Sequence, residues 1–148
     1  MRSQQAIRVL RRAVDGADDA ALERRFGSRL AQRVLFTGMA AAFDPGAAAG
    51  FSGALCYELS RPATGAPPAR WTVTVSGHRA RARRGWTDEP TLTFRLTLAD
   101  FVRIAAGTID PAVPLLQNRA SFKGDLGLAV RLPEMFGVVP RAASRRAV

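Results

Sequence analysis

The stretch T-L-T-F-R-L-T-L-A-D-F-V-R-I-A-A-G, residues 91–107, decides the fold of this chain. Apolar and polar side chains alternate over residues 92–98, which is the period of a half-buried β-strand. From Leu98 onward the apolar residues follow the three- and four-residue spacing of an amphipathic helix. Thr97 and Asp100 form a T-x-x-D capping box at the junction, and Gly107 is placed to end the helix. Both halves offer an apolar face without His, Cys or Glu, so we expect this unit to enclose something apolar.

The residues before this unit predict a helix followed by antiparallel strands. Asp18 and Asp19 favour a helix over residues 19–43, because negative charge stabilises a helix N-terminus. The apolar stripe of that helix is predicted to contain Leu22, Phe26, Leu30 and Val34. Alternation over residues 51–59 and 71–75 indicates two strands, and Ser76-Gly77 predicts a tight turn into a third strand at 79–84.

Further elements are expected after Gly107. Asp110-Pro111 combines an acidic cap with a proline at the first helical position, which is typical of a helix start. Residues 119–123 are expected to form a strand, and a last helix follows, within which Pro133 predicts a kink. Mostly antiparallel strands with helices against one face predict an α+β fold.

The net charge of +10 is concentrated in three places. Residues 1–14 carry four arginines and no acid, and residues 141–148 carry three arginines and no acid. The third place is the strand with Arg79, Arg81, Arg83 and Arg84. We therefore divide the chain into a basic N-terminal extension with a short helix (1–16), one domain (17–140) and a basic C-terminal tail (141–148). Basic segments of this kind contact anionic surfaces or simply favour solubility, and arginines on an edge strand also oppose aggregation.

The composition argues against catalysis and cofactors. Cys56 and His78 are the single residues of their types, so neither a disulfide nor a His- or Cys-based metal site is expected. Phosphate-binding and nucleophile motifs are absent, and we predict a protein that is not an enzyme and needs no cofactor. The sequence shows neither a membrane span nor the apolar core of a signal peptide, so a cytoplasmic location is expected. The preference for Arg over Lys points to a bacterial source.

Four segments together resemble the sterol carrier protein 2 (SCP2) family. They are F-S-G-A-L-C-Y-E-L (51–59), R-W-T-V-T-V (70–75), residues 91–107, and R-A-S-F-K-G-D-L-G-L-A-V-R-L-P-E-M-F (119–136). The resemblance implies a five-stranded, mostly antiparallel sheet covered by helices that enclose a hydrophobic tunnel. It also implies binding of a sterol, fatty acid, acyl-CoA or other lipid, with the helix at 19–43 as the leading helix.

The resemblance also assigns candidate site residues. The expected tunnel walls are Phe94 and Leu96 from the strand, Phe101, Ile104 and Ala105 from the helix after it, Leu115 and Leu116 from the next helix, and Leu128, Leu132, Met135 and Phe136 from the last. For each residue the alternative is ordinary core packing. The kink at Pro133 would let the last helix act as a lid. Arg79, Arg81, Arg83 and Arg84 are the candidates for contact with an anionic membrane or an acyl-CoA phosphate.

We therefore predict non-catalytic binding or transfer of a lipid or acyl-CoA ligand, with transient contacts to a membrane or a partner enzyme. The first alternative is an SCP2-like interaction or dimerisation module with a collapsed tunnel that serves a partner enzyme. The second is a basic nucleic-acid-binding protein, which lacks support from a recognition helix or an aromatic platform. The ligand and the oligomeric state stay open.

Overall fold

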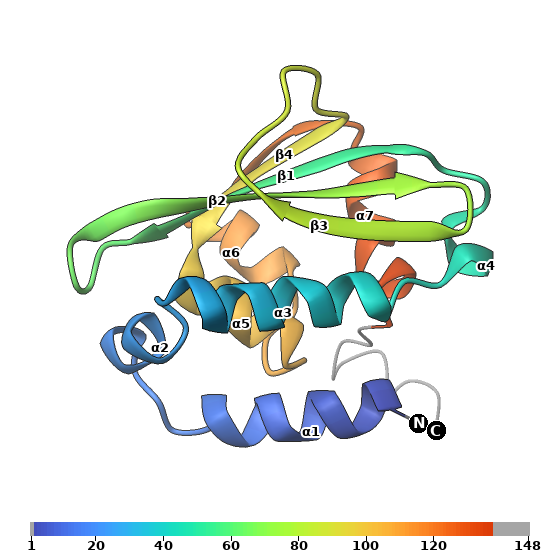
Figure 1. The fold of residues 1–148 in the computed structure, drawn as a ribbon. Helices are drawn as coiled ribbons and strands as arrows, with labels where there is room; N and C mark the ends of the chain where they lie inside the picture. Colours follow the sequence, from blue (N-terminus) through green and yellow to red (C-terminus); the bar gives the residue numbers. More distant parts are fainter. Residues whose placement is uncertain (1, 138–148) are drawn as a thin grey trace.

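A five-stranded sheet, covered on one face by helices, forms the scaffold in the computed structural model, which describes residues 2–137 (Figure 1). The strands are β1 (Gly53–Arg61), β2 (Ala66–Ser76), β3 (Arg79–Arg84), β4 (Leu92–Thr97) and β5 (Ser121–Gly124). Their order across the sheet is β3-β2-β1-β4-β5, and β1 and β4 are parallel whereas the other neighbours are antiparallel. The predicted α+β class with a mostly antiparallel sheet is confirmed.

The helices lie beneath the sheet in the view of Figure 1. They are α1 (Arg2–Val14), α2 (Asp19–Arg25), α3 (Arg29–Ala41), α4 (Pro45–Ala48), α5 (Leu98–Ala105), α6 (Ala112–Leu116) and α7 (Leu126–Met135). Helix α3 packs against β2 and β3, α5 packs against β1 and β4, and α1 lies farthest from the sheet. No helix within residues 2–137 is long and apolar enough to cross a bilayer.

The β4–α5 unit forms as its sequence predicts. The side-chain oxygen of Thr97 accepts a hydrogen bond from the Asp100 amide at 3.0 Å, which caps α5. Gly107 adopts φ +72° just after the helix, a conformation that glycine reaches without a steric penalty. Because β4 lies beside the central strand β1, α5 returns directly beneath the middle of the sheet.

The prediction of one continuous helix over residues 19–43 is wrong, because the structure has two helices there, α2 and α3. The chain leaves the helix at Phe26, and Ser28 caps a new helix by accepting from the Ala31 amide at 3.1 Å. This break resets the helical phase, so Leu30 and Val34 are 71% and 66% exposed instead of buried. Phe36 is fully buried in their place.

The N-terminal helix α1 is fastened to the domain. The Arg11 guanidinium donates through Nε to the Ala106 carbonyl at the end of α5, at 3.2 Å, and Val14 is buried in the core. The arginines of the expected basic tail, residues 141–148, lie outside the residues that the structure describes.

The region around β5 differs in one detail from the expectation. The strand begins at Ser121 rather than at Arg119, because the amides of Arg119 and Ala120 both donate to the Pro114 carbonyl of α6. The helix α7 then runs through Pro133 to Met135, and Gly137 follows it with φ +71°.

Candidate functional site

The space between the sheet and the helices is filled by a layer of aromatic side chains. Phe36 lies at its centre, stacked on Trp71 at 4.8 Å and on Phe101 at 5.0 Å between ring centroids. Tyr57 meets Phe101 edge-on at 5.4 Å and stacks on Phe94 at 5.4 Å. The layer therefore runs from β2 through α3 and α5 to β4, across the region where the resemblance expects a tunnel.

Of the eleven predicted wall residues, ten are buried or partly buried and one is exposed. Six are buried, namely Leu96, Phe101, Leu128, Leu132, Met135 and Phe136. Four are partly buried, namely Phe94, Ile104, Ala105 and Leu115. Leu116 is 82% exposed, since the short helix α6 turns this side chain to solvent while Pro114 is the side chain it buries. Whether the others contact a ligand stays a prediction.

The helix α7 is held near its C-terminal end by polar contacts to the α3–α4 region. The Asp44 amide donates to the Met135 carbonyl at 2.7 Å. The Arg131 guanidinium donates to the carbonyls of Ala47 and Ala48 at 3.2 and 3.0 Å. The N-terminal half of α7 instead leaves Leu126 and Val130 exposed to solvent, at 60% and 70%.

Two aromatic side chains at the β5 side of the interior are only partly buried. Phe94 and Phe122 are directly paired across β4 and β5, and their ring centroids are 6.2 Å apart. The exposed apolar residues Leu116 and Val130 belong to the helices that precede and follow β5. Of the rings that form the aromatic layer, Phe94 at this side is the one that is only partly buried.

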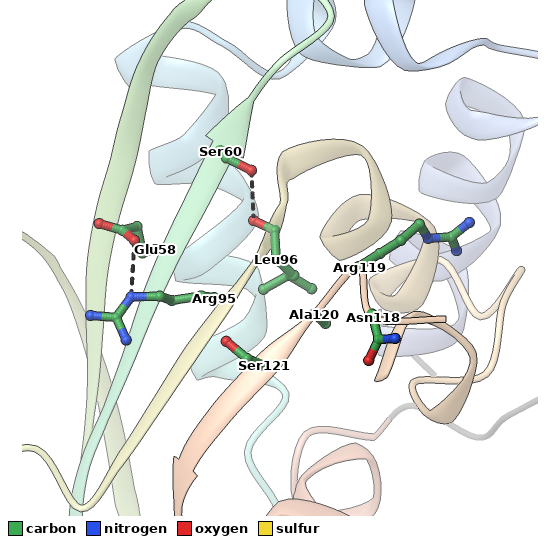
Figure 2. Close-up of a pocket in the computed structure, with 8 residues that line it drawn as sticks. All are labelled: Glu58, Ser60, Arg95, Leu96, Asn118, Arg119, Ala120 and Ser121. Carbon is green, nitrogen blue, oxygen red and sulfur yellow. Dashed lines mark hydrogen bonds and ion pairs between the residues drawn. The ribbon is translucent and has the colours of Figure 1, made fainter. Parts of the chain in front are cut away.

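Two open hollows lie at the polar side of the sheet. One, of about 280 Å³, is lined by Pro68, Arg70, Arg84 and Gly85. The other, of about 270 Å³, lies near the ends of β4 and β5, and Figure 2 shows its lining residues. Neither hollow is lined by the aromatic layer, and the tunnel itself stays a prediction.

The arginines expected to contact an anionic surface lie at one edge of the sheet. Arg79, Arg81, Arg83 and Arg84 are all exposed on the edge strand β3. The first three alternate with Ala80 and Ala82, which turn toward the helices and are packed against the core. The neighbouring helix α3 adds exposed Arg29 and Arg33 beside Leu30 and Val34.

The candidates for chemistry occupy structural positions. Cys56 is buried with its Sγ 3.5 Å from Thr72 Oγ1, and His78 is exposed at the β2–β3 turn. Burial, with a smaller contribution from Cys56, raises the pKa of the Tyr57 hydroxyl above its ordinary value. Among residues 2–137, no group of three or more His, Cys, Asp or Glu side chains is placed to hold a metal ion.

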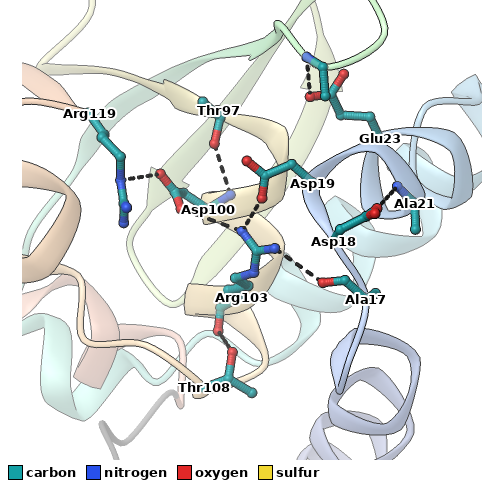
Figure 3. A network of polar contacts seen from close by, with 11 residues as sticks. Ala17, Asp18, Asp19, Ala21, Glu23, Thr97, Asp100, Arg103, Thr108 and Arg119 are labelled. Carbon is teal, nitrogen blue, oxygen red and sulfur yellow. Dashed lines mark hydrogen bonds and ion pairs between the residues drawn. The ribbon is translucent and has the colours of Figure 1, made fainter.

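A polar network that the sequence did not reveal joins the helices around α5 (Figure 3). Asp100 is almost buried and lies 3.3 Å from Arg119 and 3.8 Å from Arg103. Arg103 also donates to Asp19 at 2.6 Å and to the Ala17 carbonyl at 3.2 Å. The capping box accounts for Asp100 only as a cap residue, whereas its partner Arg119 and the Asp19 of the same network come from distant segments that no local motif identifies.

Comparisons with known proteins support the same fold. No curated protein matches this chain significantly. The crystal structure of sterol carrier protein 2 like 2 from Aedes aegypti is 23% identical, with a TM-score of 0.56, over 72% of this chain and 96% of that one. The solution structure of palmitated SCP2L2 from the same species is 22% identical, with a TM-score of 0.56, over 70% and 92% of the two chains.

The fold also occurs inside a much larger enzyme. The inverting sec-alkylsulfatase Pisa1 from Pseudomonas sp. is 21% identical with a TM-score of 0.54, over 69% of this chain but only 15% of that one. These structural likenesses concern the fold. The sequence model of the SCP-2 sterol transfer family matches residues 39–137, and this chain therefore belongs to that family.

Proposed function

We propose that this protein binds an apolar lipid between its sheet and its helices and transfers it without covalent chemistry. Family membership supports the proposal, and so does the apolar interior bounded by β4, α5 and α7. The observation that carries it is the Phe94–Phe122 pair, which stays partly exposed at the β5 side of an otherwise buried aromatic layer. Each lipid CH₂ buried there contributes about 0.8 kcal/mol before the cost of binding.

In this proposal α7 moves to admit the ligand. Its buried side chains Leu132 and Met135 close the interior, and its polar attachment to the rest of the domain includes the Asp44 and Arg131 contacts. Outward movement of α7 exchanges contacts with the aromatic layer for contacts with the lipid chain. We also propose that the protein is cytoplasmic and that its source is bacterial.

Native mass spectrometry of the purified protein tests the proposal. We expect a 1:1 complex with a lipid that co-purifies or with added dodecanoate, and a rise in melting temperature as the lipid is titrated. A matched titration with the short-chain butyrate controls for nonspecific carboxylate binding. The proposal fails if neither a fatty acid, a fatty alcohol, a sterol nor an acyl-CoA binds.

Replacing Arg131 should change the kinetics of lipid uptake. In Arg131→Ala, α7 loses its hydrogen bonds to Ala47 and Ala48, so we expect uptake of a fluorescent fatty acid to accelerate about threefold to tenfold, as a lowering of the barrier by about 1 kcal/mol predicts. Stopped-flow fluorescence measures the rate. Arg24→Ala, at an exposed position on α2, is the matched control, and equal rates for both variants would contradict a moving α7.

The β3 edge is the proposed side for contact with an anionic membrane. Each basic residue near such a surface contributes about 1 kcal/mol, so Arg81→Glu with Arg83→Glu should weaken binding to phosphatidylserine vesicles by about thirtyfold or more. Vesicle co-sedimentation at low salt measures the partition. The control is Arg8→Glu with Arg12→Glu on α1, far from the sheet (Figure 1). If both double variants lose the same amount of vesicle binding, the effect comes from net charge and not from the β3 edge. If the β3 variant loses DNA binding and keeps vesicle binding, the nucleic-acid alternative is supported.

The filled interior favours a second candidate function, an interaction module for a partner enzyme. Phe36 and Met135 are fully buried, and the fold occurs within the Pisa1 alkylsulfatase chain. This candidate predicts that no lipid changes the melting temperature, whereas a partner protein co-elutes with the chain.

A further inference from the structure

Four aromatic side chains form a row across the face of the sheet that the helices cover. Their order from β2 through β1 and β4 to β5 is Trp71, Tyr57, Phe94 and Phe122, each in register with the next. Phe36 from α3 and Phe101 from α5 meet Tyr57 at 5.7 and 5.4 Å between ring centroids. Tyr57 is the single tyrosine of the chain, and it places a hydroxyl in the middle of the aromatic layer.

The rings of the aromatic layer carry two polar groups, and the protein provides a partner for one of them. The Trp71 indole N–H donates to Oε1 of Gln32 at 3.0 Å, and Gln32 is buried to provide this acceptor. Outside the sheet ladder, the hydrogen bond that Tyr57 makes within residues 2–137 uses its main-chain carbonyl, which accepts from the Trp86 indole at 3.3 Å. Its hydroxyl has no hydrogen-bond partner among these residues.

A tyrosine that is 5% exposed and leaves its hydroxyl unpaired is unusual, because buried tyrosines ordinarily find a hydrogen-bond partner. No fully buried side-chain nitrogen or oxygen within residues 2–137 lacks a partner, so the unpaired hydroxyl belongs to the small accessible part of Tyr57. A molecule that enters the aromatic layer can therefore reach this hydroxyl.

The surroundings of Tyr57 decide which chemical group suits its hydroxyl. Burial raises the pKa of the hydroxyl, so it stays protonated and acts as a donor. The rings that contact it, those of Phe36, Phe94 and Phe101, are uncharged. An ionised group placed among them would lose its hydration without gaining a counter-charge. The donor thus fits an uncharged oxygen, and the charged end of a ligand that has one stays outside the layer.

We propose that Tyr57 is a specificity-determining residue of the lipid site and that its hydroxyl donates a hydrogen bond to an uncharged carbonyl oxygen in the apolar part of the ligand. The inference rests on the proposed lipid binding. A hydrocarbon of the same shape would fill the same space and leave the donor unpaired. The protein therefore distinguishes a lipid that carries a ketone or ester carbonyl from a pure hydrocarbon.

Tyr57→Phe tests the donor with matched ligands. These are 2-undecanone and 6-undecanone, each compared with the alkene in which a methylene group replaces the carbonyl oxygen. Loss of one neutral hydrogen bond should weaken the binding of at least one ketone by about threefold to tenfold and change alkene binding by less than about twofold. The rise in melting temperature during titration gives the relative affinities. Ser121→Ala, which removes an exposed hydroxyl from β5, is the control and should change neither.

Infrared spectroscopy of the bound ketone provides a second measurement. A hydrogen bond from Tyr57 should lower the carbonyl stretching frequency in the wild-type complex relative to the same ketone in hexane, and Tyr57→Phe should remove this shift. An unshifted carbonyl band in the wild-type complexes of both ketones would overturn the proposal, whether or not the variant folds.

The ligand-free protein tests the unpaired state of the hydroxyl separately. Tyr57→Phe should melt at the same temperature as the wild type or above it, because the substitution removes no hydrogen bond. A melting temperature that is lower by about 2–4 °C would show that the hydroxyl is bonded within the protein, and the proposal would then be wrong.

The outcomes separate this inference from the proposed lipid binding. If the wild type binds neither the ketones, the alkenes nor any other lipid, lipid binding fails and the role of Tyr57 fails with it. If the wild type binds ketones and alkenes and Tyr57→Phe leaves their affinity ratios unchanged, the role of Tyr57 alone is overturned.

Discussion

Phe36→Ala is expected to lower the free energy of unfolding by about 3–5 kcal/mol. Phe36 has no exposed surface and stacks between Trp71 and Phe101, with Tyr57 at 5.7 Å. Truncation removes its transfer free energy and also leaves a cavity whose rigid aromatic neighbours cannot close. Urea denaturation followed by circular dichroism measures the change.

The control for this prediction lies on the same helix. Leu30→Ala truncates a side chain that is 71% exposed, so it should change stability by less than about 0.5 kcal/mol. A loss under about 2 kcal/mol for Phe36→Ala would mean that the surrounding rings collapse into the space. An interior that rearranges in this way would accommodate a lipid chain with only a small loss of packing free energy.

The β4–α5 unit was predictable because its information is local. Alternation, helical spacing, the Thr97 cap and Gly107 all lie within 17 consecutive residues, 91–107, and they agree with one another. The parallel pairing of β4 with β1 is a different matter, since it joins Leu55 to Leu92 across a hairpin that separates them in sequence. The sequence analysis did not predict that pairing, because the resemblance implied only a five-stranded, mostly antiparallel sheet and periodicity does not show which strands pair.

The break between α2 and α3 was missed because an apolar stripe can be drawn through it. Leu22, Phe26, Leu30 and Val34 keep perfect four-residue spacing, whereas the residues that α3 buries are Gln32 and Phe36. Gln32 is 1% exposed because its amide accepts from the Trp71 indole at 3.0 Å and donates to the Gly27 carbonyl at 3.2 Å. A buried glutamine is invisible to hydrophobic patterning, although the Gly27-Ser28 pair was a usable signal for a new helix start.

The site was only partly predictable for a related reason. Phe94 and Phe101 have the same sequence pattern whether they line a cavity or fill a core. The sequence therefore identifies the apolar faces of β4 and α5, but it does not tell whether a cavity separates these faces. The hollow between β4 and β5 depends on the left-handed Asn118 and on two bonds to Pro114. Neither feature has a periodic signature.

Glu23→Ala is expected to lower the free energy of unfolding by about 2–4 kcal/mol, since hydrogen bonds to a charged group contribute about 1.5–3 kcal/mol each and water recovers part of them. Glu23 is 2% exposed, and its carboxylate accepts from the amides of Ala63 and Thr64 at 3.0 and 2.9 Å and from the Thr64 hydroxyl at 2.8 Å. These contacts fasten α2 to the end of the β1–β2 hairpin.

Two further variants show how much single hydrogen bonds of Glu23 contribute to the free energy of unfolding. Thr64→Val deletes one of the three hydrogen bonds and should cost about 1 kcal/mol, and Glu23→Gln keeps an acceptor and should fall between the other two changes. Amide hydrogen exchange at Ala63 and Thr64 localises the effect, because both amides lose their acceptor in Glu23→Ala alone. If all three variants unfold at the same urea concentration as the wild type, α2 is not fastened to the hairpin through this carboxylate. If they follow the expected order, one buried acid sets how the leading helices lie against the sheet, and hence where α3 places Phe36 in the aromatic layer.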